Sequence, residues 1–108
     1  MLRPDNHKRS RLQEARAAED YKGKRTPGSG NQWHSKGDIK TDDYLIECKT
    51  TTKASYSLKY QDLLKIWKEA VLESRTPLFE IEFSTIGMTF VVLEKNDFLG
   101  MKQQLEGD

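Results

Sequence analysis

Three residues carry the chemistry that the sequence points to: Asp38, Glu47 and Lys49. The first lies in an expected strand at 37–40, and the other two lie in the next expected strand, 44–50, after a short turn. Because side chains alternate along a strand, Glu47 and Lys49 share one face. Two carboxylates that meet at a sheet edge form an oxygen site suited to Mg²⁺, and a nearby ammonium can hold an attacking water and stabilise charge on a phosphate.

The same residues also allow a simpler interpretation. Glu47 and Lys49 taken alone would make an ordinary exposed ion pair on one strand. The acid at Asp38, the loop motif Gly28-Ser29-Gly30 and the order of the expected elements together favour a catalytic role. Glu14 remains open between a site acid and a solvated helix residue, and Ser29 between a site residue and a flexible turn residue.

The elements that must position these residues follow from periodicity and turn signals. Apolar residues recur at helical spacing from 58 to 74, which predicts the main helix, packed on the sheet. A first helix is expected at 10–20, capped by Ser10, with Leu12 and Ala15 near one side. The remaining expected elements are a loop at 22–37, strands at 78–83 and 88–93 around a turn, and a short helix at 96–105 that closes the domain.

Length and composition limit the class of protein. The chain has 108 residues, of which 35% are apolar and 32% charged, so we expect a single domain, 1–108, with a small core. The net charge is only +1, yet the stretch 1–26 has eight Lys or Arg against four acids, and we expect 1–9 to be a flexible basic arm. Such a basic end suits a polyanion or a solvated surface.

Cysteine content and hydropathy indicate the compartment. The single cysteine, Cys48, excludes an internal disulfide and a cysteine-based zinc site, and its strand position predicts a buried thiol without chemistry. The sequence has no apolar run long enough to cross a bilayer and no apolar leader segment. We therefore expect a cytoplasmic protein, in a host cell if the chain is viral, with no membrane partner.

The spacing of Asp38 from Glu47-Cys48-Lys49 resembles the signature of the PD-(D/E)XK nuclease superfamily, with Gly37 in place of the usual proline. Upstream, a helix with Glu14, the Gly28-Ser29-Gly30 loop and Lys36-Gly37-Asp38 are similar to the layout of archaeal-type Holliday-junction resolvases. The resemblance covers about 10–83. It implies an α/β, restriction-endonuclease-like fold, with a mixed central β-sheet flanked by α-helices.

The resemblance also implies roles for individual residues. Asp38, Glu47, the Cys48 backbone carbonyl and Glu14 would hold Mg²⁺, for which Mn²⁺ could substitute, and Glu19 competes with Glu14. Ser29, in the active-site loop at 23–36, would lie near the scissile phosphate, and Gln61 is a further candidate beside the metal. The expected DNA contacts are Arg9, Arg11, Lys24, Arg25, Ser29, Lys36, Lys53 and Ser55.

The function that this resemblance implies is Mg²⁺-dependent cleavage of branched DNA, most specifically resolution of a Holliday junction. Because a four-way junction has two-fold symmetry, we expect a homodimer whose contact uses apolar strands and helices after Leu78. Trp67 is expected in the core or in that interface. The alternatives are a nuclease of the same fold that acts on flaps, forks or duplex, and a DNA-binding module that does not cut.

Overall fold

The computed structural model describes residues 4–26 and 38–107 and has a mixed α/β fold. Its described part contains a five-stranded mixed sheet, in the order β1-β2-β3-β4-β5, and three helices. The elements are α1 (Pro4–Tyr21), β1 (Lys24–Arg25), β2 (Ile39–Lys40), β3 (Tyr44–Thr51), α2 (Tyr60–Leu72), β4 (Thr76–Phe83), β5 (Met88–Val92) and α3 (Lys95–Leu105).

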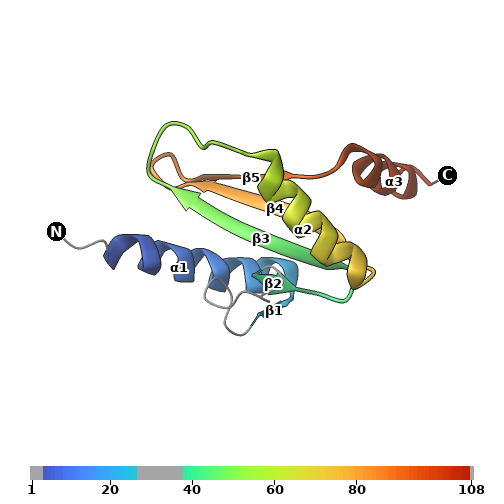
Figure 1. Ribbon diagram of the computed structural model, residues 1–108, viewed down its shortest axis with the longest axis horizontal. Coiled ribbons are helices and arrows are strands. Elements are labelled where there is room, and N and C mark those ends of the chain that lie inside the picture. The colour runs from blue at the N-terminus through green and yellow to red at the C-terminus, as the bar shows by residue number, and fades with distance from the viewer. Residues whose placement is uncertain (1–3, 27–37, 108) are drawn as a thin grey trace.

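Strand β3 is central to the sheet (Figure 1). It pairs antiparallel with β2 on one side and parallel with β4 on the other, over a register that runs from Tyr44 opposite Thr76 to Thr51 opposite Phe83. Parallel neighbours need a crossover connection, and α2 supplies it. The edge strands β1 and β5 are antiparallel to β2 and β4.

Successive residues of β3 feed two separate apolar clusters, because alternate side chains point to opposite faces of the sheet. Ile46 and Cys48 pack in the cluster that includes Ala17 of α1, whereas Leu45 packs in the cluster that includes Ile66 of α2. The two helices therefore cover opposite faces. The expected alternation along this strand is confirmed, and so is the burial of the Cys48 thiol.

Helix α1 differs most from the expectation. It begins at Pro4, so residues 4–9 of the expected flexible arm are helical and Ser10 lies inside the helix rather than at its cap. The expected inward side was also wrong, since Leu12 is 49% exposed while Gln13 is 2% exposed. The buried face follows positions 13, 17 and 21. Because one of these residues is a glutamine, the pattern of apolar residues does not reveal this face.

Two further expectations are wrong in part. Part of the expected loop at 22–37 forms β1, and positions 27–37, which include Ser29 and Lys36, lie outside the described residues. Gly23 permits this strand, because a Cβ there would lie 2.8 Å from the Lys40 carbonyl oxygen. Trp67, expected in the core or in a dimer interface, is 43% exposed, so the core position is wrong and the interface position stays a prediction.

Helix α3 does not close the domain as expected. It has no buried residue over Lys95–Leu105 and extends beyond the end of the sheet (Figure 1). Among the helices that the structure describes, none has the length and apolar character needed to cross a membrane.

The structure predicts which α1 side chain supports the fold. The Gln13 side chain donates hydrogen bonds to the Lys49 carbonyl oxygen and to Glu80, at 2.9 and 3.1 Å. We expect Gln13→Ala to lower the free energy of unfolding by about 1–3 kcal/mol, since it leaves buried acceptors without this donor. Leu12→Ala, the matched control one residue earlier, should cost about 1 kcal/mol or less. Urea denaturation measures both, and the reverse order would contradict the packing of α1.

Candidate active site

Asp38 is fixed to β3 by two hydrogen bonds. Its amide donates to the Ile46 carbonyl oxygen at 2.8 Å, and its Oδ2 accepts from the Cys48 amide, also at 2.8 Å. Asp38 directly precedes β2, and its carboxylate acts electrostatically on Glu47 of β3. The Asp38 side chain is buried, so its carboxylate is held at one position beside the second acid.

Glu47 lies in an electrostatic environment that opposes its ionisation. Burial raises its pKa most, and the nearby Asp38 carboxylate raises it further, to about 7. Two lysines oppose this shift: Lys49, whose Nζ lies 3.5 Å from Glu47 Oε2, and Lys65. A divalent cation bound between two close carboxylates would offset their mutual repulsion and favour their ionised forms.

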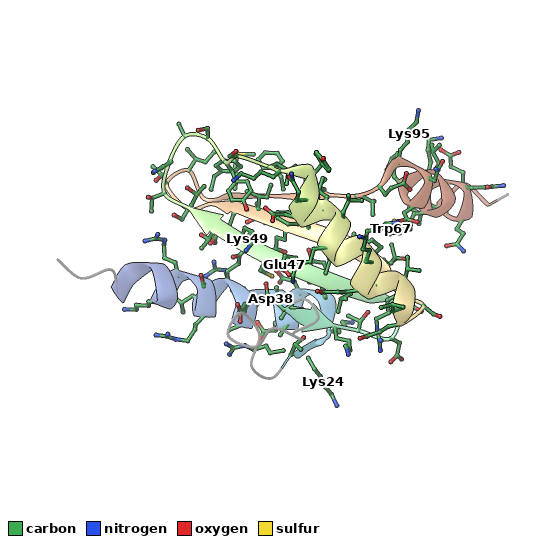
Figure 2. All side chains as sticks on the ribbon, viewed as in Figure 1. Lys24, Asp38, Glu47, Lys49, Trp67 and Lys95 are labelled. Atoms are coloured by element: carbon green, nitrogen blue, oxygen red, sulfur yellow. The ribbon has the colours of Figure 1, made fainter. Side chains whose placement is uncertain are left out.

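Lys49 combines a fixed backbone with an accessible ammonium. Its carbonyl oxygen accepts the Gln13 hydrogen bond, and Gln13 also binds Glu80, which accepts from the Tyr21 hydroxyl at 2.7 Å. Helix α1 is thus tied to β3 at the residue that carries the candidate lysine. The Lys49 side chain is 41% exposed, so it can contact a ligand while staying next to Glu47. Figure 2 shows Asp38, Glu47 and Lys49 close together, between α1 and α2.

Glu14 is the α1 acid that faces this site. Burial and the Asp38 carboxylate raise the pKa of Glu14, while Arg25 lowers it. The Arg25 guanidinium lies 3.4 Å from Glu14 Oε1. Glu19, the competing acid, is exposed on α1. Of the two, Glu14 is the one whose charge interacts with Asp38.

Helix α2 contributes an ion pair that sequence analysis missed. Lys65 and Glu69 lie 3.0 Å apart, and the charges of both act on Glu47. In sequence they look like a solvated i,i+4 pair. Their position in the sequence could have indicated this role. Lys65 directly precedes Ile66 and Glu69 directly precedes Ala70, and these two residues are buried on the side of α2 that faces the sheet.

The expected DNA-contact residues lie mainly on the surface. Ser29 and Lys36 belong to the part of the chain that the structure does not describe. Gln61 is exposed in the first turn of α2, whereas the charges that act on Glu47 come from later turns of this helix. The exposed candidates are Arg11, Lys24, Arg25, Lys53 and Ser55, and Arg9 is partly exposed on α1.

The donor set can be tested against Mg²⁺. Within residues 4–26 and 38–107, no three His, Cys, Asp or Glu side chains are grouped so that they could hold a metal ion. Magnesium keeps several waters and is commonly bound through one or two carboxylates. Asp38 and Glu47, with the Cys48 backbone carbonyl as a third oxygen, therefore fit Mg²⁺ and do not fit a metal that needs a closed cage of side chains.

Comparison with known proteins adds no family to this description. No model of a known protein family matches the chain, and a search of curated proteins finds no match either. The geometry and charges of the site are therefore the basis on which a function can be proposed.

The Glu47 pKa predicts how stability depends on pH without metal. Its folded pKa of about 7 lies above the ordinary 4.5, so folding favours the protonated acid. This contribution is fully present below about pH 4.5 and is lost as pH rises through about 7. We expect the free energy of unfolding in EDTA to fall by on the order of 1–3 kcal/mol across that window. Urea denaturation of Glu47→Gln should lack this fall, and identical profiles for the two proteins would contradict the assignment.

Proposed function

We propose that this protein is a Mg²⁺-dependent, structure-specific endodeoxyribonuclease, and that its substrate is branched DNA, in particular the four-way junction. One observation carries the proposal: the Asp38 carboxylate, held by the Cys48 amide, lies close enough to Glu47 to raise its pKa, and the Lys49 ammonium lies 3.5 Å from Glu47. The mixed sheet with helices on both faces supports it, because the restriction-endonuclease-like architecture has this general form.

Each residue of the site has a distinct task in this proposal. Mg²⁺, when bound, would supply an acidified water and neutralise charge on the scissile phosphate. Asp38 contributes a carboxylate whose position is set by the Cys48 amide, so little reorganisation is needed on binding. Glu47 contributes the second carboxylate. Lys49 can orient the attacking water and stabilise negative charge on the phosphate in the transition state.

Exposed cations near the site support a polyanionic substrate. Arg25 contacts Glu14, whose charge acts on Asp38, and Lys24 is exposed beside it in β1. In Figure 2, Lys24 extends away from the fold. Such cations bind phosphates without reading base sequence, which suits recognition of DNA by shape. A two-fold symmetric junction is cut at two opposed strands, so the proposed active form is a homodimer in the cytoplasm.

A cleavage assay tests this function. We expect paired nicks in a labelled four-way junction with Mg²⁺ or Mn²⁺, no nicks in EDTA, and a loss of about 10²–10⁴-fold in rate for Asp38→Asn and for Glu47→Gln. Asp42→Asn, which changes an exposed acid in the β2–β3 turn, is the matched control and should cut normally. Equal cutting of the matching linear duplex would refute the junction substrate, and binding without cutting in every metal would refute the enzyme.

The position of Glu14 predicts an indirect effect on metal binding. We expect Glu14→Gln to raise the Mg²⁺ concentration that gives the half-maximal cleavage rate by about tenfold, because it removes a negative charge that acts on Asp38. Glu19→Gln, the same change on an exposed residue of α1, should leave that dependence unaltered. A Mg²⁺ titration of the cleavage rate compares the two, and an equal effect of both variants would remove Glu14 from the site.

A further inference from the structure

A groove of about 590 Å³ lies between α2, β4 and the segment that joins β5 to α3. The side chains that line it are mainly apolar, and they include Leu63, Leu64 and Trp67 of α2 and Leu93 of the joining segment. Figure 2 shows Trp67 on the other side of α2 from Asp38, Glu47 and Lys49. The groove is therefore separate from the candidate active site.

Helix α2 carries a second apolar stripe beside its sheet-facing one. Tyr60, Leu64, Trp67 and Val71 follow the i, i+4, i+7, i+11 spacing of one helix side, and their exposed fractions range from 43% to 68%. The sheet already covers the side that holds Ile66. A helix that leaves a further stripe of large apolar residues in water has the pattern of an interaction surface.

Helix α3 has the complementary property, an apolar side with no surface beneath it. Phe98 and Leu105 are 51% and 88% exposed, and Met101 lies between them at helical spacing. None of the residues Lys95–Leu105 is buried. An isolated helix of eleven residues is marginal in water, so α3 requires a partner surface for its stability.

In the structure, α3 does not lie in the groove of its own chain. Only Leu93 and Glu94 separate β5 from α3. The Glu94 carboxylate caps α3 by accepting from the Asn96 and Asp97 amides, at 2.9 and 3.2 Å, which fixes the direction in which the helix leaves. Asn96 lines the groove, so α3 starts at its rim and runs outward, past the end of the sheet (Figure 1).

We propose that α3 of a second copy of this chain fills the groove, and that the exchange is reciprocal. One two-fold contact then covers both apolar surfaces of each chain, the groove and the apolar side of α3, which begins at the rim of the groove. The extended outline of a single copy agrees: its longest dimension is 54 Å and its radius of gyration is 14.3 Å, against about 13 Å for a compact chain of 100 residues. This inference does not rest on the nuclease proposal.

The first test is the mass of the full chain in solution, measured by sedimentation equilibrium over a range of concentrations. We expect twice the 12.5 kDa of one chain. Phe98→Asp should raise the dimer dissociation constant by about thirtyfold or more, because a buried aromatic anchor becomes a charge. Ile86→Asp, at a 65% exposed position in the β4–β5 turn, is the control and should not. A monomer at every concentration, or equal effects of the two variants, would overturn the proposal.

The second test identifies the contact itself. Leu64→Cys and Phe98→Cys are made as separate proteins, mixed, and treated with a short bismaleimide crosslinker. Cys48 is buried and burial raises its pKa, so the engineered thiols are the ones that react. We expect a crosslinked dimer from the mixture and little from either protein alone. A crosslink within one chain of the double variant, at monomer mass, would show that α3 folds back and would overturn the proposal.

Discussion

The hydrogen bond from the Cys48 amide to the Asp38 carboxylate is the contact on which the candidate site depends. Strand β2 has only two residues, and so short a strand has few ladder bonds of its own to define its register. The side-chain bond adds a third point of attachment, one residue before the strand begins. It holds the first acid beside Glu47, and it does so inside the protein, where water cannot compete for the amide.

The charges around this contact include acids that repel one of their neighbours and cations that partly offset this repulsion. Burial raises the pKa of Glu14 and of Glu47 most, and the Asp38 carboxylate repels both acids and raises each pKa further. Lys49, Lys65 and Arg25 each lower the pKa of one of these acids. A core built for stability alone would not gather three acids, one from α1, one from β3 and one from the residue before β2. Local conflicts of this kind are concentrated at functional sites, where a ligand resolves them.

Sequence patterns predicted the elements whose periodicity is strong. Strand β3 and helix α2 were found within a few residues, because apolar residues mark their buried sides and alternation fixes which face Glu47 shares with Lys49. Strand β1 was missed, since two exposed basic residues carry no periodic signal. The inward side of helix α1 was predicted wrongly because the side chain of Gln13, which is buried, carries an amide, and hydropathy treats an amide as a surface group.

Only the part of the candidate site whose residues are close in sequence could be predicted. Asp38 and Glu47 are joined by one turn, so their approach follows from hairpin pairing. Glu14 and the Lys65–Glu69 pair reach the site through helix packing on opposite faces of the sheet, which no spacing along the chain encodes. Gln13 was not considered, because its role exists only through contacts with β3 and β4.

The eight-residue parallel register between β3 and β4 sets an order on folding. The β2–β3 turn closes a short loop, whereas β4 pairs with β3 across the intervening chain from 52 to 75, so we expect this non-local pairing to be the slower step. We therefore expect the two acids to meet while water still screens them, and their repulsion to grow when α2 buries Glu47. The electrostatic conflict is added late on the folding route, so it acts mainly on the rate at which the finished fold opens rather than on the rate at which it forms.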